Sequence, residues 1–402
     1  MEKLKIYAPS YVEEFNCIGG ECEDNCCIGW DIDVDQATFR RYHKIKEEPY
    51  RSMFNKYIIN NKEYVNKDLD YGRIKLNKEK RCPFLDECNY CNIHKKYGHE
   101  YLGSVCSQYP RVVNRIDDFY EISLDLGCPE AARIILSARD PIYLQEISYK
   151  TDKYTLAGYL ETKSEEFSNS SIRYFKEIRN YSLKIIQNRN YDISTRLYVL
   201  GRFLDELQEV KVDDILKLIK TFNVDKIVEE YEIDYMNYAL QVSFLKKIID
   251  ELDIINETDS DRFRKLTIKA LKGFNISSNE DIVNNSSQII SMYKRYNEEC
   301  MKEYDYIIEN YLVNFILNNL FPFSESDYEF DGYILLVVRY SLIKFYLVGK
   351  YIVSGQESEA SIIELLQVFV KAVEHDRNYR SEILDYLKEN DFDNIMFAKM
   401  LL

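Results

Sequence analysis

The amino-acid sequence predicts a mainly α-helical fold: a loop-rich cysteine-cluster module at the N-terminus, with room for short strands, followed by an irregular helical bundle. Two observations carry this prediction. Nine of the ten cysteines lie between Cys17 and Cys128, where most of the Gly and Pro turn signals also lie. From about residue 155 onward, apolar residues recur instead at helical spacing. We therefore expect a cysteine-rich module over residues 1–140 and a helical domain over residues 141–402.

The helical spacing is clearest in three segments of the C-terminal part. Apolar residues share one face over residues 304–316 and again over residues 362–373, and a third face is formed by Leu197, Leu200, Leu204 and Leu207. Polar runs separate such segments, and we expect roughly six to ten helices in this part. In the N-terminal module, Arg73–Leu76 and Glu121–Leu126 alternate weakly in the manner of short strands.

The charge balance argues against a nucleic-acid partner. The formal net charge is −15, whereas proteins that bind a phosphate backbone do so through clustered Lys and Arg. Residues 1–150 contain 22 Lys and Arg against 25 Asp and Glu, and the rest of the chain contains 31 against 43. The acidic C-terminal part has the charge to attract a lysine-bearing partner, although a solvated surface is the simpler interpretation.

Neither an export signal nor a membrane span is expected. The N-terminal segment MEKLKIYAPS lacks the apolar stretch that export needs. The most apolar stretch, Tyr333–Val353, is interrupted by Arg339, Lys344 and Lys350, so we expect a buried helix and no membrane insertion. A cytoplasmic location follows, in which thiols stay reduced. A dense set of cysteines there indicates metal or redox chemistry before disulfides.

The cysteines between Cys17 and Cys128 form two close groups and two single positions. The segment FNCIGGECEDNCCIGW contains Cys17, Cys22, Cys26 and Cys27, the segment RCPFLDECNYCNIHKKYG contains Cys82, Cys88 and Cys91, and the single positions are Cys106 and Cys128. Soft thiolates at short spacing suit zinc and iron–sulfur clusters, because a tight loop aims several sulfurs at one point. Side chains of adjacent residues diverge, so only one of Cys26 and Cys27 is expected to bind the same ion.

The spacing alone leaves the metal open, and buried thiols without a metal are the third alternative. The density of cysteines counts against that alternative, except at the lone Cys300. Structural zinc sites usually show two Cys-x2-Cys knuckles, and here only the pair ending at Cys91 has that form. Proline follows Cys82 and Cys128, as it follows a ligand in bacterial ferredoxin motifs, which favours an iron–sulfur cluster. The CxxxCxxC pattern of radical S-adenosylmethionine enzymes is absent, because Gly29 stands at the third position.

In these residues the chain resembles the flagellin lysine-N-methylase family, which is related to a wider family of cysteine-cluster proteins. The shared elements are YxxxFxCIGxxCxxxCCxGWxID at Tyr11–Asp33, CPFL at Cys82–Leu85, CxI at Cys91–Ile93, CxxYPR at Cys106–Arg111 and SLxLxCPEAAR at Ser123–Arg133. They occur in fixed order over about 120 residues. The helical remainder has the family's length and texture but contributes no motif.

The resemblance implies methylation of surface lysines on flagellin, with S-adenosylmethionine as the methyl donor. It also implies an iron–sulfur cluster of the 4Fe-4S type, with zinc as the fallback. Cys88 falls where the family has another residue, so the resemblance leaves eight metal-ligating thiols: Cys17, Cys22, Cys26, Cys27, Cys82, Cys91, Cys106 and Cys128. Neither a catalytic base nor a donor pocket can be identified from the sequence.

Two other functions stay open. The chain could be a non-enzymatic metal- or cluster-binding module that docks a protein partner through its helices, or it could be an electron carrier. Binding of S-adenosylmethionine separates the enzyme from the docking module. Reversible one-electron reduction without methylation would indicate the carrier.

Overall fold

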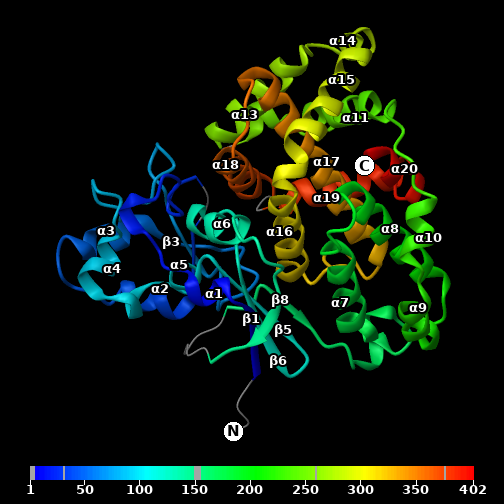
Figure 1. Cartoon of the computed structure of the whole chain (residues 1–402). Helices are drawn as coiled ribbons and strands as arrows, with labels where there is room; N and C mark the ends of the chain where they lie inside the picture. Colours follow the sequence, from blue (N-terminus) through cyan, green and yellow to red (C-terminus); the bar gives the residue numbers. More distant parts are fainter. Residues whose placement is uncertain (1–4, 30–31, 149–154, 259, 375–376) are drawn as a thin grey trace. The chain divides into compact units, whose positions relative to one another are not determined.

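The computed structural model describes residues 5–29, 32–148, 155–258, 260–374 and 377–402. The chain divides into two compact units (Figure 1). Unit 1 comprises the residues up to Ala131 together with Tyr143–Tyr159, and unit 2 comprises Ala132–Ile142 together with Leu160–Leu402. Helices predominate and the strands are short, which confirms the prediction of a mainly α fold.

Unit 1 is built around a five-stranded sheet of order β7-β1-β6-β5-β8, in which β1 and β6 are parallel. The sheet strands are β1 (Lys5–Pro9), β5 (Arg111–Ile116), β6 (Phe119–Leu124), β7 (Leu144–Glu146) and β8 (Gly158–Leu160). Strands β5 and β6 form an antiparallel hairpin that closes at Ile116 and Phe119. Its turn contains Asp117 with a φ of 52°, a conformation that Asp tolerates better than most residues. The sequence pattern indicated β6 but not the sheet.

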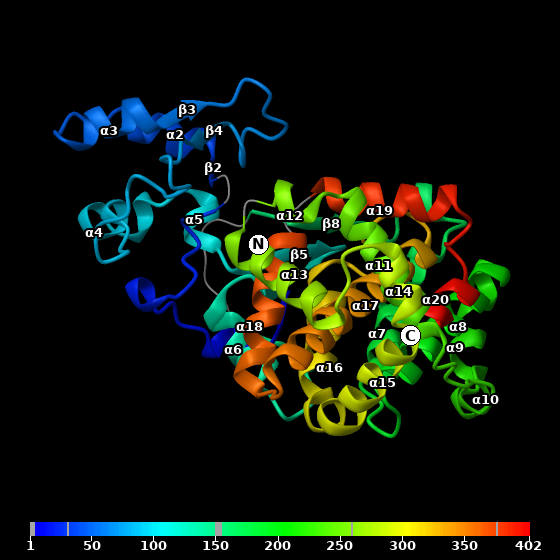
Figure 2. The same cartoon turned by 90° about the horizontal axis from the view of Figure 1, so that it is seen from above.

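A second, smaller sheet of unit 1 has the order β2-β4-β3 and is antiparallel. Figure 2 shows its strands together with α2 and α3. The elements of this part are β2 (Ile32–Val34), α2 (Gln36–Tyr42), α3 (Tyr50–Tyr57), β3 (Ile58–Asn60) and β4 (Gly72–Ile74). The other helices are α1 (Tyr11–Glu14), α4 (Asn92–Tyr97), α5 (Ser104–Gln108) and α6 (Pro129–Leu136), the last of which continues into unit 2. The weak alternation near Arg73 therefore marks a real strand.

Unit 2 is helical. Its helices are α7 (Phe175–Ile186), α8 (Ile193–Glu209), α9 (Ile215–Thr221), α10 (Val224–Glu229), α11 (Asn237–Glu251), α12 (Ile254–Glu257), α13 (Asp261–Phe274), α14 (Asn279–Asn284), α15 (Ser286–Tyr296), α16 (Lys302–Asn318), α17 (Glu329–Ser354), α18 (Glu359–Phe369), α19 (Arg377–Glu389) and α20 (Ile395–Leu401). The described part of the unit thus has more helices than the six to ten expected. Short helices such as α10, α12 and α14 span too few residues to show a periodic apolar face.

Helix α17 forms the core of unit 2 and packs against α8, α11, α13 and α15. By length and composition it is the one described helix that could cross a membrane, but its most apolar window is entirely buried in the protein. The prediction of a buried helix over Tyr333–Val353 is therefore confirmed. The contact with α13 is very close, because a Cβ atom added at Gly273 would lie 2.1 Å from the carbonyl oxygen of Gly349. Only glycine permits this approach of the two backbones.

Candidate metal centre

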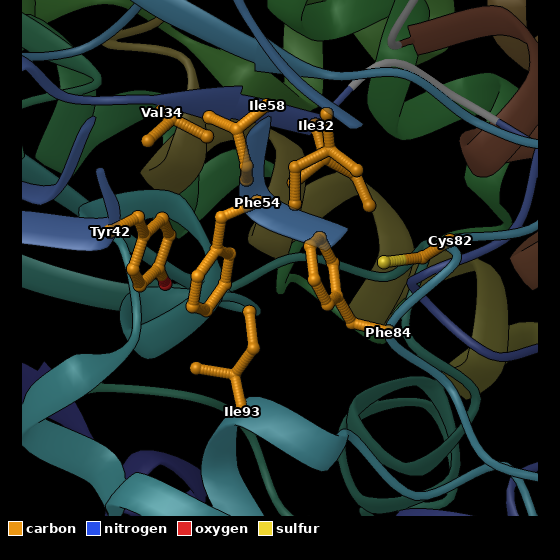
Figure 3. Close-up of a cluster of buried hydrophobic side chains, with 9 residues drawn as sticks. Ile32, Val34, Tyr42, Phe54, Ile58, Cys82, Phe84 and Ile93 are labelled. Atoms are coloured by element: carbon orange, nitrogen blue, oxygen red, sulfur yellow. The ribbon is translucent and has the colours of Figure 1, made fainter. Parts of the chain in front are cut away.

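Four of the thiols of unit 1 lie in or against a small hydrophobic core. Its buried members come from β2, β3, β4, α2, α3, α4 and the loop before α4: Ile32, Val34, Tyr42, Phe54, Ile58, Ile74, Cys82, Phe84 and Ile93. Figure 3 shows the Cys82 side chain at the edge of this cluster, beside Phe84. The rings of Tyr42 and Phe54 stack with their centroids 4.6 Å apart, and Phe84 lies 5.2 Å from Phe54. Aromatic packing therefore holds in place the hydrophobic cluster against which these thiols lie.

Four of the predicted ligands meet at this core. Cys82 is buried within it, and the partly buried Cys27, Cys91 and Cys106 pack against it. They come from four different segments: the loop before β2, the loop after β4, the residue before α4, and α5. The fold thus gathers thiols that are up to 79 positions apart in the chain, from Cys27 to Cys106.

Backbone hydrogen bonds hold these loops in register. The amide of Cys82 donates to the carbonyl oxygen of Cys27 at 2.9 Å. The amide of Cys27 donates to the Asn25 side chain at 2.8 Å. Cys91 forms an antiparallel bridge with Leu85, so the loop from Cys82 to Cys91 closes on itself. Main-chain contacts therefore position these three cysteines, whatever their sulfurs bind.

The two cysteine-rich loops also pack directly on each other at Gly20. A Cβ atom at this position would lie 2.3 Å from the carbonyl oxygen of Cys88 and 2.6 Å from the ring of Tyr90. The preceding Gly19 has a φ of +59° and lies under the same ring. Glycine is therefore required for the contact, which explains the Gly-Gly pair inside the first cysteine segment.

The thiols lie in surroundings that disfavour the thiolate form. Burial raises the pKa of Cys82 to about 12, and it also raises the pKa values of Cys91 and Cys106, where the charges of neighbouring thiols add to the effect. A hydrogen bond with the Cys26 side chain lowers the pKa of Cys27, but burial and the neighbouring thiols outweigh it, so that this pKa is raised as well. Several buried thiolates need a cation to compensate their charge.

The four core thiols have the chemistry that a soft metal needs and lie in one region of the fold, but they do not form a complete ligand set. Thiols are the ligands that zinc and iron–sulfur clusters use. Within the described residues, however, no three His, Cys, Asp or Glu side chains converge as a group that holds a metal ion. The four core thiols thus share one hydrophobic cluster without forming such a group.

The other predicted ligands differ in how close they lie to these four. Cys26 is exposed but lies close to them: its side chain forms a hydrogen bond with Cys27, and its charge raises the pKa values of Cys82, Cys91 and Cys106. Cys22 and Cys26 both contribute to the pKa of Cys128, which burial raises to about 12, so these three thiols interact electrostatically. Cys17 is exposed, and its sulfur accepts a hydrogen bond from Gly19 at 3.4 Å. The ligand set itself stays a prediction.

The cysteines outside the predicted set differ from it in their surroundings. Cys88 is exposed at the tip of the second loop. Cys300 is buried in unit 2, in a π-helical turn before α16, which agrees with its interpretation as an isolated structural thiol. A shallow cavity of about 330 Å³ lies beside the second loop and is lined by Tyr90, Cys91, His94 and Lys95. It leaves Cys91 accessible from solvent.

Sequence reasoning missed Asp35, which fixes the position of Cys106. One carboxylate oxygen caps α2 by accepting the amide of Thr38 at 2.8 Å. The other accepts the amide of Ser104 at 3.1 Å and its hydroxyl at 3.0 Å. This second contact ties the start of α5, and with it Cys106, to β2. An Asp three residues before Thr38 is an N-cap signal, but the partner at Ser104 is visible only in the fold.

Comparison with known protein families finds a match within unit 2. A family model described as the FliB lysine N-methylase C-terminal domain matches residues 179–401. Two similar proteins named lysine-N-methylase, from Salmonella typhimurium and Salmonella choleraesuis, are each 29% identical over 216 residues, which is 53% of this chain and 50% of the relative. The chain thus spans about half the length of these relatives.

A third relative is shorter. The flagellar biosynthetic protein FliU of Salmonella muenchen is 31% identical over 186 residues, which cover 46% of this chain and 98% of that protein. No solved structure matches the chain. The matched segment of the family model contains the helices from α8 to α20 and none of the cysteines of unit 1.

Proposed function

The chain belongs to the FliB lysine N-methylase family, and we propose that it transfers methyl groups from S-adenosylmethionine to lysine side chains of flagellin. The match of residues 179–401 to the family's C-terminal domain carries this proposal. The names of the relatives, a lysine-N-methylase and a flagellar biosynthetic protein, support the reaction and a flagellar substrate. The five motif elements between Tyr11 and Arg133 support it independently, because they lie outside the matched domain.

The reaction is a polar substitution. The lone pair of the lysine ε-amine attacks the methyl carbon of the sulfonium, the carbon–sulfur bond breaks, and S-adenosylhomocysteine leaves as a neutral thioether. The amine must first lose a proton, and with an unperturbed pKa of about 10.4 roughly one amine in a few thousand is neutral at pH 7. The enzyme must therefore bind the lysine where its neutral form is favoured, or supply a proton acceptor.

The proposed metal centre belongs to unit 1. Cys27, Cys82, Cys91 and Cys106 would hold a metal ion or one edge of an iron–sulfur cluster against the hydrophobic core, with Cys17, Cys22, Cys26 and Cys128 as the remaining predicted ligands. A bound metal would stabilise this loop-rich unit, because the free energy of binding to thiolates is gained only in the folded state. Methyl transfer to an amine needs no electron, so we assign the centre a structural role.

The test is methyl transfer by the full chain, purified without oxygen. Incubation with unmethylated flagellin and S-adenosylmethionine should place methyl groups on lysine ε-amines, as located by peptide mass spectrometry. Reactions without the donor, and with flagellin whose lysines have been acetylated, are the controls. If metal-loaded, folded protein neither binds the donor nor modifies flagellin, the enzyme proposal fails and a docking module takes its place.

A further inference from the structure

Residues 229–240, which we call the α10–α11 segment, expose several apolar side chains. Ile233 is 40% exposed, Tyr235 44%, Met236 61% and Leu240 56%. The segment thus contains four of the 17 large apolar side chains that are exposed in the described part of the chain. In Figure 1 the connection between α10 and α11 runs along an edge of unit 2. Exposed apolar side chains that gather in one place, unlike scattered ones, mark a surface that binds a partner.

Local hydrogen bonds hold the α10–α11 segment in place. A carboxylate oxygen of Asp234 accepts the amide of Met236 at 3.0 Å, and its carbonyl oxygen accepts the amide of Asn237 at 3.0 Å. Met236 and Leu240 lie on the same side of α11, because positions four apart are neighbours on a helix. Tyr238, on the opposite side, is buried. A fixed backbone therefore presents the exposed apolar side chains.

The same segment carries exposed carboxylates. Glu229, Glu230, Glu232 and Asp234 are all exposed. Glu230 is paired with Arg202 at 3.4 Å. Within the residues that the structure describes, neither Glu229 nor Glu232 forms an ion pair. These two carboxylates thus remain available for cations from outside the chain.

Two tyrosine rings of the segment already attract ammonium groups of this chain. The Nζ atom of Lys294, on α15, lies 3.9 Å from the ring centroid of Tyr235. No carboxylate among the described residues pairs with Lys294, so the ring is its closest attractive contact. The Nζ atom of Lys399 lies 5.8 Å from the ring centroid of Tyr231. A lysine of a partner protein presents the same chemical group.

We propose that the α10–α11 segment docks the protein substrate through a stretch in which lysines stand beside apolar side chains, an inference that rests on the proposed function. The apolar side chains of that stretch pack on Ile233, Met236 and Leu240, and its lysines pair with Glu229 and Glu232. An acidic partner would be repelled by these carboxylates. The segment lies within the part matched by the family model. Docking here is separate from methyl transfer, so it affects binding of the substrate protein and leaves donor binding unchanged.

The experiment measures binding of the full chain, purified without oxygen, to immobilised unmethylated flagellin. Met236→Ser combined with Leu240→Ser should weaken binding about ten- to a hundredfold, because both side chains lose apolar contacts with the partner. Ile268→Ser combined with Val353→Ser is the matched control, since these side chains are 48% and 42% exposed on α13 and α17. Both double variants should melt at the wild-type temperature, because the replaced side chains are exposed.

Charge variants test the chemistry of the partner. Glu229→Gln combined with Glu232→Gln should weaken binding about two- to tenfold at low salt and less at high salt. Glu165→Gln combined with Glu166→Gln, which removes two exposed carboxylates elsewhere in unit 2, should leave binding unchanged. Lys294→Met should strengthen binding about two- to fivefold, since it removes a competing cation beside the segment. Opposite signs in the glutamate and lysine variants would show an acidic partner and overturn the inference.

Methylation assays separate this inference from the proposed function. Met236→Ser combined with Leu240→Ser should raise the KM for flagellin and leave kcat and S-adenosylmethionine binding unchanged. Unchanged flagellin binding by that variant, with methylation intact, would overturn the inference and leave the proposed function standing. Flagellin binding through this segment without methylation would overturn the function and support the docking surface. A wild-type dimer that the variant dissociates, with flagellin binding unchanged, would assign the segment to a second copy of the chain and overturn the inference.

Discussion

At the scale of single residues, some cysteines share a hydrophobic core with other cysteines, whereas Cys300 has no other cysteine in its unit among the described residues. Cys82 is buried against Phe84 and has three further thiols beside its core, whereas Cys300 has only the helices of unit 2 around it. Both are buried thiols, so burial alone does not separate them. What separates them is the number of neighbouring thiols, and this difference makes the ligand prediction testable.

Serine substitutions should therefore rank the cysteines by how much metal each variant loses. Serine at Cys82, Cys91, Cys106 or Cys128 should release metal and lower the melting temperature of unit 1, because a hydroxyl is a poor ligand for a soft metal. The Cys88→Ser variant should lose little metal, and Cys300→Ser should keep its full metal content. Metal analysis of anaerobically purified protein gives the answer. Full metal retention by the first four variants would show that the ligands lie elsewhere.

The pH dependence of stability is a second residue-scale prediction. Burial lowers the pKa of Lys344 to about 8 in the folded protein, so its contribution to stability is present above the unfolded pKa and is lost as the pH falls through about 8. Burial raises the pKa of Asp305 on α16 to about 6, so its contribution is present at acid pH and is lost as the pH rises through about 6. Both contributions are missing between these values.

Urea unfolding of the wild type and of Lys344→Met across pH 6 to 10 tests the lysine part. At pH 7 the variant should be the more stable of the two by up to 3 kcal/mol, on the order of the pKa shift converted to free energy. The difference should shrink as the pH rises above about 8, where the wild-type amine becomes neutral. A difference that does not change with pH would show that Lys344 is not the titrating group.

At the scale of elements, the sequence predicted the long helices better than the sheets. The face formed by Leu197, Leu200 and Leu204 lies on α8, and each of these side chains is buried. Helices carry such signals locally, because side chains three and four positions apart share a face. The five-stranded sheet joins β1 to β6, more than 100 positions later, and its edge strands are three residues long. Pairing over that distance leaves no local pattern to detect.

The same difference of scale applies to the candidate site. The cysteine spacing predicted a thiol centre, but it could not show that Cys27, Cys82, Cys91 and Cys106 share one core, since that depends on how four segments pack. The same holds for Lys344, which stood out in the sequence only as a charge within an apolar stretch. Its tyrosine neighbours come from α11, α15 and α17, so their packing around the ammonium exists only in the fold.

The packing of the two cysteine loops can be tested at Gly20. Gly20→Ala should destabilise unit 1 by about 1–3 kcal/mol, because the added methyl group meets the Cys88 carbonyl and the Tyr90 ring with no room to move. Gly103→Ala is the control, since a Cβ atom there has only ordinary contacts, at 3.7 Å and beyond. Thermal melting with metal bound measures both. Equal melting temperatures for the two variants would mean that the loops do not depend on this contact.

At the scale of the whole molecule, the cysteine motifs and the segment that matches the family model belong to different units. The thiols other than Cys300 belong to unit 1, and the segment that matches the family model, residues 179–401, belongs to unit 2. The motifs quoted from the sequence and the domain found by comparison are thus separate parts of the chain that indicate the same family. We therefore expect methylation to require both the thiols of unit 1 and the helices of unit 2.

The most direct measurement is the intact mass of flagellin produced together with this chain in bacterial cells that do not methylate their own flagellin. With the wild-type chain, the flagellin should show a series of peaks separated by one methylene mass. With Cys82→Ser, or with no added chain, it should show the unmodified mass alone, and Cys300→Ser should behave as the wild type does. A single unmodified peak in the presence of soluble, metal-loaded wild-type chain would contradict the assignment of this protein as a flagellin lysine methylase.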